Sequence, residues 1–470
     1  MPYRDAGLRQ GVCSVFAALV SASLCASAIS QGGTSDNQSS PTVQFVYYKV
    51  ANIPLAMDAP PRKDIYSVST KNTEEKQLTK DGHSFNPVLS PDGTQIAYIH
   101  VTADTCEDCL VPPRYEINVM NADGTEPRTV VSIDKPVLLT WSPDGRTLVY
   151  GGAVPVIRQL YPGLPDSDTI SEMASLASLD SSAYPLYQTK SDGDAPARLL
   201  AENATGFFNK LKWSPDGKWM AYSCRGPQES GKRRFRVCLL GTGQQAETRV
   251  LTESADFLQP YSWSPDGTQI VYSVFDQEAN KLRKDPYRVF VVRTDGSTPR
   301  LLTTTKNGVT TPQWSHDGDT VVFCDREKDK SSIEIIKADG TGKVRLTDPK
   351  LNASNPMWSA DGREIAFTAS VHGKLQVHLM NADGSQLRAL TRDTKLACSN
   401  ITWVRNTRLL LLRCGQAAAP LGPRFGASVD GGYYLLSTAD PIGTPRPLAQ
   451  QGAMAISFAM DEESSVPGAR

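Results

Sequence analysis

Residues 141–150 read WSPDGRTLVY and residues 263–272 read WSPDGTQIVY, so nearly the same ten residues occur twice in one chain. Ser-Pro-Asp-Gly suits a type I turn, because Ser provides an acceptor at the first position, Pro fixes φ at the second and Gly tolerates the left-handed conformation at the fourth. The Trp before this turn and the apolar run after it favour a pleated, half-buried backbone. The stretch therefore predicts a tight β-hairpin.

The same hairpin recurs along most of the chain. Its turn aspartates stand at positions 92, 144, 216, 266, 317 and 361, in steps of 52, 72, 50, 51 and 44 residues. In one copy His316 replaces the turn proline, and a seventh copy around Trp403 has lost the turn motif. A period of this size is typical of one β-propeller blade.

A second hairpin lies between copies of the first. It carries Asp-Gly at 123–124, 295–296, 339–340 and 383–384 and leads into Arg-Leu-Thr-like segments such as 345–347. Two hairpins per period give four antiparallel strands, and four-stranded units of about 40 to 50 residues are typical of a β-propeller. We therefore expect an all-β protein of four-stranded antiparallel blades.

The alternation of these two hairpins resembles the TolB-type, WD-like propeller repeat over roughly residues 43–460. The same repeat occurs in scaffolds, in non-catalytic parts of peptidases and in some lyases, so the resemblance implies the fold and leaves function open. In TolB a separate α/β domain precedes the propeller, and residues 31–44 are too few to form one. The expected protein is TolB-like without that N-terminal domain.

The ends of the propeller indicate how its ring closes. Strand-like runs at 43–50, 65–69 and 77–79 precede the first hairpin, and 454–460 is a single run near the C-terminus. Docking the C-terminal strand onto the N-terminal blade would remove an exposed sheet edge. This closure predicts eight blades. Seven is the alternative, if the repeat around Trp403 merges with the closing strand.

The N-terminus has the layout of a secretory signal peptide: Arg4 and Arg9, an apolar and small-residue stretch from 11 to 28, and Ala26-Ser27-Ala28. We expect a signal peptide at 1–28, a disordered linker at 29–42, the propeller at 43–460 and a disordered tail at 461–470. A membrane anchor is the alternative, but a spanning helix needs about 20 predominantly apolar residues. The expected location is the periplasm or the exterior, with peripheral membrane association if any.

Charge and cysteines narrow the class of protein further. The chain has 49 basic and 50 acidic residues, so no nucleic-acid partner is expected. In an exported chain the cysteines suggest disulfides, and we expect Cys224 with Cys238, Cys398 with Cys414, Cys106 with Cys109, and a lone Cys324. The rival interpretation makes Cys106 and Cys109 half of a zinc site, but there is no second Cys-x-x-Cys or spaced His pair. No cofactor is expected.

Loop lengths distinguish two faces of the ring. Both Asp-Gly hairpins turn on one face, here called the turn face, whereas long connections such as 152–184 and 415–431 leave the opposite, long-loop face. The connection after Tyr150 also carries a capping box at 169–172 and an apolar stripe, which predict a helix. Long loops on one rim of a rigid scaffold are where binding function concentrates.

Candidate partner-binding residues form two groups. Basic side chains on the long-loop face would make an electropositive rim for an acidic peptide or polysaccharide, and residues that begin the innermost strands would approach the channel mouth. The rim group is Arg225, Lys232, Arg233, Arg234, Lys281, Arg283 and Lys284, and the channel group is Asn86, Lys210, Gln259, Thr311, Asn355 and Asn400. The alternative roles are solvated loops with interleaved acidic residues, and turn formation before prolines.

The six motif tryptophans, at 141, 213, 263, 314, 358 and 403, are expected in the core between blades. No Gly-x-Ser-x-Gly elbow or phosphate-binding loop is present, and the chain has only five His residues. The sequence therefore favours an exported, non-catalytic, monomeric scaffold that binds a protein or peptide. The alternative is a polysaccharide lyase or hydrolase with a metal and His378 or another His in the channel, because some TolB-like propellers are lyases of that kind.

Overall fold

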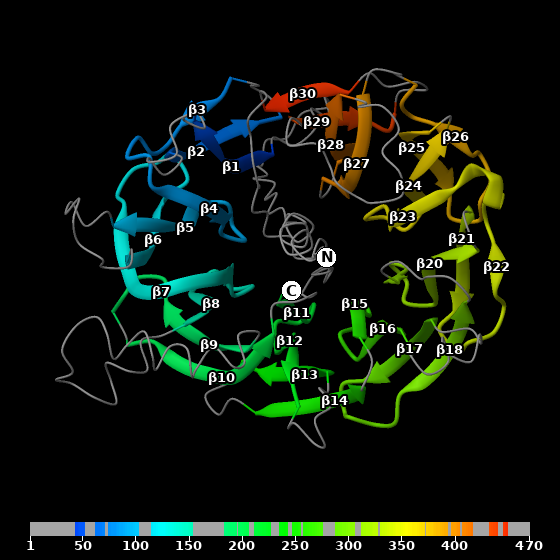
Figure 1. Ribbon diagram of the computed structural model, residues 1–470, viewed down its shortest axis with the longest axis horizontal. Coiled ribbons are helices and arrows are strands. Elements are labelled where there is room, and N and C mark those ends of the chain that lie inside the picture. Colours follow the sequence, from blue (N-terminus) through cyan, green and yellow to red (C-terminus); the bar gives the residue numbers. More distant parts are fainter. Residues whose placement is uncertain are drawn as a thin grey trace, which may run out of the picture.

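In the computed structural model, small antiparallel sheets stand around a central axis as the blades of a β-propeller (Figure 1). The structure describes residues 43–51, 62–70, 74–102, 114–153, 183–194, 196–205, 211–226, 235–242, 247–254, 257–275, 287–305, 312–327, 330–371, 373–392, 396–404, 407–416, 432–439 and 445–449. The expected all-β fold class is confirmed. The described part of the chain holds no helix long and apolar enough to cross a membrane.

The first sheet has three strands, which match the three runs expected before the first hairpin. They are β1 (Gln44–Ala51), β2 (Arg62–Ser69) and β3 (Lys76–Gln77). Strand β1 pairs with β2 and lies at the sheet edge within the described residues.

Strands β4 to β14 are joined into one continuous sheet. They are β4 (Ser84–Leu89), β5 (Gln95–Thr102), β6 (Arg114–Asn121), β7 (Arg128–Trp141), β8 (Thr147–Ala153), β9 (Ala183–Lys190), β10 (Arg198–Thr205), β11 (Lys212–Trp213), β12 (Trp219–Arg225), β13 (Phe235–Gly241) and β14 (Thr248–Ser254). The continuity has two causes: β7 pairs with β6 through its first half and with β8 through its second, and β10 pairs with β12 through Ala204 and Cys224. Register shifts on both sides of Pro136 let one strand serve two blades.

The rest of the chain forms four separate four-stranded sheets, each in sequence order from the innermost strand outward. The strands are β15 (Phe257–Trp263), β16 (Gln269–Phe275), β17 (Tyr287–Arg293) and β18 (Arg300–Thr305); β19 (Gln313–Trp314), β20 (Thr320–Glu327), β21 (Lys330–Lys337) and β22 (Val344–Arg345); β23 (Ala353–Trp358), β24 (Glu364–Val371), β25 (Lys374–Asn381) and β26 (Arg388–Ala389); and β27 (Leu396–Trp403), β28 (Leu409–Gln416), β29 (Gly432–Ser437) and β30 (Arg446–Ala449). A short 3-10 helix, η2 (Pro349–Leu351), precedes β23.

The motif hairpin forms as its residues predict. In the copy at 263–269, Ser264 Oγ donates to Asp266 Oδ1 at 2.6 Å, and the Gly267 amide donates to the Ser264 carbonyl at 2.9 Å. Gly267 has φ +67°, which is the left-handed conformation that glycine tolerates best. The Trp263 indole Nε1 donates to the Lys212 carbonyl of the preceding repeat at 3.1 Å, so the tryptophan ties consecutive blades together.

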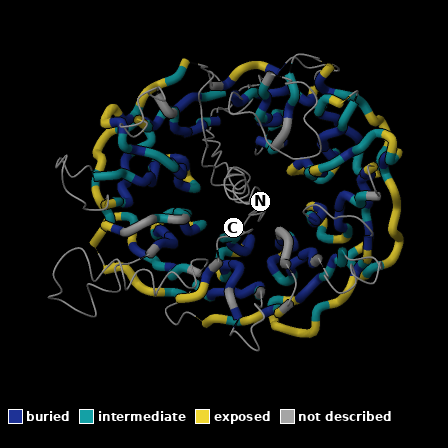
Figure 2. The backbone as a smooth tube through the Cα atoms, in the orientation of Figure 1, coloured by how far each residue is buried: buried dark blue, intermediate teal, exposed yellow. Residues whose placement is uncertain are grey.

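The hydrophobic core lies between neighbouring sheets, and the exposed residues lie mainly around the outer circumference (Figure 2). One cluster joins Ala221 and Val237 to Tyr261 and Trp263 of the next sheet. Another joins the first sheet to the last, because Phe45 and Tyr47 of β1 pack with Leu411, Tyr433 and Leu435. The strands β27 to β30 therefore lie beside β1 to β3 (Figure 1).

Several expectations lie outside the described residues: the signal peptide, the linker, the helix near 169–179, the closing strand at 454–460 and the C-terminal tail. They stay predictions.

Candidate functional site

Most of the expected basic rim lies outside the described residues. This holds for Lys232, Arg233, Arg234, Lys281, Arg283 and Lys284, and for Lys210 and Thr311 of the channel group. Arg225, Gln259 and Asn400 belong to β12, β15 and β27, but the structure does not describe their side chains. The basic rim therefore stays a prediction.

Asn86 and Asn355 are the members of the channel group with described side chains. Each lies near the beginning of an innermost strand and has a left-handed backbone, with φ of 50° and 53°. The strand register shifts at both places, between Phe85 and Val88 and between Ser354 and Met357. Asparagine tolerates this conformation better than most residues. Both asparagines therefore have a structural role, as residues of a bulge before proline.

Two of the three expected disulfides are present. Cys224 on β12 is bonded to Cys238 on β13, with 6.0 Å between their Cα atoms. Cys398 and Cys414 are direct partners on β27 and β28, and their Cα atoms are 4.1 Å apart. Cys324 is buried as a thiol whose Sγ donates to the Ala353 carbonyl at 3.4 Å. The third expected pair, Cys106 and Cys109, lies outside the described residues.

The histidines that would support a metal-dependent lyase do not gather in the described part of the chain. His378 on β25 is buried, stacks on Phe367 with ring centroids 5.5 Å apart, and has its pKa lowered by burial. His100 lies on another blade, with Nδ1 3.3 Å from Ser84 Oγ. Within the described residues, no group of three or more His, Cys, Asp or Glu side chains is placed to hold a metal ion. His378 thus packs against its direct strand partner within one sheet.

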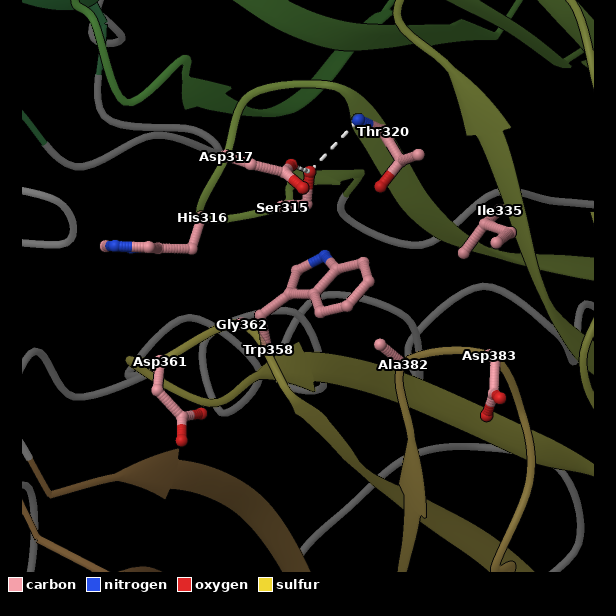
Figure 3. A pocket seen from close by; sticks show the side chains of 10 residues that line it. All are labelled: Ser315, His316, Asp317, Thr320, Ile335, Trp358, Asp361, Gly362, Ala382 and Asp383. Carbon is pink, nitrogen blue, oxygen red and sulfur yellow. Dashed lines mark hydrogen bonds between the residues drawn. The ribbon is translucent and has the colours of Figure 1, made fainter.

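A cavity of about 360 Å³ lies on the turn face between the sheets β19–β22 and β23–β26. The hairpin 315–320 forms one wall, the hairpins 361–362 and 382–383 form the other, and Ile335 and Trp358 also line it. In Figure 3 the Trp358 indole lies between the two walls, and the His316 imidazole points away from it. The lining is therefore mixed and mainly apolar: Trp358, Ile335 and Ala382 contribute apolar surface, and serine, threonine and aspartate side chains contribute the polar groups.

Three carboxylates line this cavity, on Asp317, Asp361 and Asp383. The hydrogen bond from Ser315 lowers the pKa of Asp317, and the bond from Ser385 does the same for Asp383. Burial acts to raise the pKa of Asp361, but hydrogen bonds to its carboxylate outweigh this effect and lower it. All three groups are therefore anionic at neutral pH, and the cavity suits a cation.

Trp358 differs from most of the other motif tryptophans. Trp141, Trp213, Trp263 and Trp314 are buried as expected, whereas Trp358 is partly exposed. Its Nε1 is buried without a hydrogen-bond partner among the described residues, as are those of Trp213 and Trp314, in contrast to the Trp263 indole. The sequence predicts Trp358 in the core, and the residue does pack against a core cluster between the two sheets while also lining the cavity. The signal for the cavity was the neighbouring His316, in a turn position that four other copies fill with proline.

Known proteins similar to this chain share its repeat. Residues 274–417 match the family described as the TolB beta propeller domain. Over 58 residues the chain is 41% identical to the Tol-Pal system protein TolB of Thioalkalivibrio sulfidiphilus (strain HL-EbGR7), and this segment covers 12% of each chain. The match thus spans only a small part of that relative's length.

Solved structures superpose on this chain to different extents, and at least one exceeds a TM-score of 0.5. Dipeptidyl peptidase 4 of Porphyromonas gingivalis superposes with a TM-score of 0.54 at 12% identity, over 83% of this chain and 56% of that one. TolB from Acinetobacter baumannii has a TM-score of 0.38 at 16% identity, over 76% and 79% of the two chains. The fold is that of a β-propeller. The repeats within residues 274–417 are of the TolB type, so the resemblance noted from the two hairpins is confirmed for that part of the chain.

Proposed function

We propose that this protein is an exported, non-catalytic β-propeller that binds a protein or peptide through its long-loop face. The observation that carries the proposal is the difference between the two faces. On the turn face, motif hairpins such as those after Trp141 and Trp263 reverse within a few residues. On the other face, β8 and β9 are joined by residues 154–182, and β28 and β29 by 417–431. Long segments on a rigid ring provide the variable surface that recognition needs.

The proposed location is the periplasm or the exterior. The disulfides Cys224–Cys238 and Cys398–Cys414 support an oxidising compartment. The relative with 41% identity over 58 residues is described as a Tol-Pal system protein, which supports a place in the cell envelope. We expect a monomer that associates with membranes peripherally, if at all.

We also propose that the ring has eight blades and is closed by residues 454–460 as the innermost strand of the first blade. The first sheet supports this closure, because β1, β2 and β3 occupy the places of the second, third and fourth strands of the other blades. The place inside β1 is therefore the one that a closing strand would fill.

Charge reversal on the rim tests the binding proposal. We expect Arg233→Glu, Arg234→Glu and Lys284→Glu together to reduce capture of partners from an envelope fraction several-fold and to flatten its dependence on salt, because the lost contacts are electrostatic. The melting temperature should stay nearly unchanged, since charged residues in long connections rarely contribute much to stability.

The matched control reverses Arg146, Lys218 and Arg363, which are exposed on the turn face. This variant has the same change in net charge and should capture partners as the unmodified protein does. Equal loss in both variants would show that only net charge matters and would contradict a binding rim. A stoichiometric divalent metal in the purified protein, bound through histidine, would instead favour the lyase alternative.

A further inference from the structure

One position on the outermost strands carries arginine in nearly every sheet. We define this position by the residue that pairs with it on the third strand of the same sheet. In most repeats that partner residue stands four positions before the aspartate of the second Asp-Gly hairpin, as Val291 does before Asp295. The occupants of the position are Arg128, Arg198, Arg249, Arg300, Val344, Arg388 and Arg446, paired with Val119, Gln188, Leu239, Val291, Ile335, Leu379 and Leu435 respectively. There are two exceptions, Val344 and Lys76. Lys76 is paired with Ser67 in the first sheet, and its Nζ still donates to a carbonyl of the next sheet, that of Asp123, at 2.7 Å.

At this bridging position four of the six arginines reach the next sheet, whereas Arg198 and Arg446 make no such bond to a described residue. Arg128 Nη2 donates to the Ser191 carbonyl at 3.1 Å, and Arg249 Nη1 donates to the Thr294 carbonyl at 2.6 Å. The same bond joins Arg300 to the Ala338 carbonyl and Arg388 to the Thr438 carbonyl. For these four arginines the acceptor always stands at the same place in the next sheet, three residues after that sheet's own partner residue. For Arg300 the acceptor is Ala338, three residues after Ile335. The guanidinium groups thus bridge consecutive blades.

The sheet β19–β22 lacks this bridge. In the next sheet the partner residue is Leu379, so an arginine at position 344 would donate to the carbonyl of Ala382, three residues later. No described residue donates a hydrogen bond to the Ala382 carbonyl. Ala382 lines the cavity, and so does Ile335, which is the direct strand partner of Val344. Direct partners project from the same face of a sheet, so a longer side chain at position 344 would extend along the cavity wall. The cavity therefore lies where four other blades place a guanidinium group.

The lining also has unused acceptors for a cation. In three other motif turns, the second carboxylate oxygen takes a bond from the side chain two residues on, as Asp266 Oδ2 does from Thr268 and Asp216 Oδ2 does from Lys218. At the equivalent place after Asp317 stands Asp319, which has no proton to donate when ionised. No described side chain donates to Asp317 Oδ2. The cavity thus combines one free carboxylate oxygen, Asp317 Oδ2, with the Trp358 ring, which attracts cations over its face, while the Asp361 and Asp383 carboxylates point away from the indole (Figure 3).

We propose that this cavity binds the guanidinium group of an arginine side chain from a partner polypeptide, in the place of the missing intramolecular bridge. A guanidinium suits the site better than an ammonium, because it is planar, stacks on an indole and offers several donors in a fixed fork. A polypeptide suits it better than free arginine, because three aspartates repel the carboxylate of a free amino acid. The site lies on the turn face, so it is separate from the binding proposed for the long-loop face.

The probe for this site is a blocked tripeptide, acetyl-Gly-Arg-Gly-amide, titrated by calorimetry at low ionic strength. Its control is the citrulline peptide, which has nearly the same shape without the charge. We expect the arginine peptide to bind at least about tenfold more tightly, from the charged hydrogen bonds and the contact with Trp358. The lysine peptide should fall between the two.

Val344→Arg is the decisive variant, because it supplies the missing guanidinium from within the chain. It should abolish binding of the arginine peptide and raise the melting temperature, whereas Val344→Leu should do neither. Asp383→Asn keeps an acceptor for the Ser385 amide while removing one charge, so it should weaken binding even if Val344→Arg folds poorly. Two results would contradict the proposed guanidinium site: equal affinity of the protein for the arginine and citrulline peptides, or an unchanged affinity of the Val344→Arg variant for the arginine peptide. If free arginine binds as tightly as the blocked peptide, the polypeptide source is wrong.

Discussion

At the scale of single residues, the turn glycine of the motif is required for its backbone conformation. Its left-handed φ closes the hairpin, as at Gly267. The same glycine also lies beside the preceding turn: a Cβ built on Gly267 would lie 3.5 Å from Pro215 Cδ, and one on Gly217 would lie 3.5 Å from Pro143 Cγ, which are ordinary van der Waals distances. The need for glycine can be predicted from one copy of the motif. The contact between consecutive turns becomes visible only when the copies are placed side by side.

Gly267→Val should destabilise the fold by about 1 to 3 kcal/mol, because a β-branched residue is strained at positive φ. The space around the glycine is not limiting, since the contacts of the added Cβ would be ordinary van der Waals distances. Chemical denaturation measures the change in the free energy of unfolding. Gly267→Asn is the control and should cost less, because asparagine tolerates the left-handed region. Equal stability of Gly267→Val and the unmodified protein would contradict the role of φ at this turn.

At the scale of strands, the hairpins could be predicted from the sequence because each is encoded in about ten contiguous residues. The arginine bridges could not, because donor and acceptor come from different repeats: Arg300 and Ala338 are 38 residues apart, and only the register brings them together. The cavity was hidden for the same reason. It depends on two exceptions to the repeat, His316 and Val344, whose positions meet at one interface only in the folded ring.

The strands β20 to β22 also hold a group of charges with a testable pH dependence. Burial and the nearby Glu334 carboxylate raise the pKa of Asp325 to about 6, although Lys343 Nζ lies 3.6 Å from Asp325 Oδ2. Lys343 Nζ is also 2.9 Å from Glu334 Oε2, but their geometry does not make a hydrogen bond. Lys343 is thus shared by two carboxylates, and Arg345 Nε donates to Glu334 Oε1 at 3.0 Å. Burial and the Glu334 charge outweigh both cations, so an ionised Asp325 is unfavourable in the folded state.

Because the folded pKa of Asp325 lies above the unfolded value of 3.8, the folded state binds the proton more tightly, and stability falls as pH rises between these two values. Asp325→Asn mimics the neutral form. It should raise the free energy of unfolding at pH 8 by on the order of 1 to 3 kcal/mol, with the gain vanishing near pH 4. Denaturation at both pH values measures this difference.

Asp295→Asn is the contrasting control. The Ser297 backbone amide and other donors lower the pKa of Asp295 to about 2, so its ionised form is favoured in the folded state. This variant should lose stability at neutral pH and not gain it. A pH-independent effect of Asp325→Asn would show that its carboxyl titrates normally.

At the scale of the whole molecule, the ring depends on contact between its first and last sheets. Phe45 and Tyr47 provide this contact on one side of β1. The Thr70 amide donates to the Val43 carbonyl. Because the direction of the backbone N–H and C=O groups alternates along a strand, the odd-numbered residues of β1 point these groups toward β2 and the even-numbered residues point them away from β2. The amides of Val46 and Tyr48 therefore face the inner edge of the sheet, where no described strand pairs with them.

Removing residues 450–470 should therefore open the ring. If 454–460 pairs with the inner edge of β1, the truncation removes about four backbone hydrogen bonds at about 1 kcal/mol each, and the melting temperature should fall. Removing only 461–470 is the matched control and should leave the melting temperature unchanged. Hydrogen exchange at Val46 and Tyr48 distinguishes lost pairing from general destabilisation, because these amides should lose protection while those of Phe45 and Tyr47, which face β2, keep it longer. Equal melting temperatures for the two truncations would mean that another segment, or none, covers the inner edge of β1.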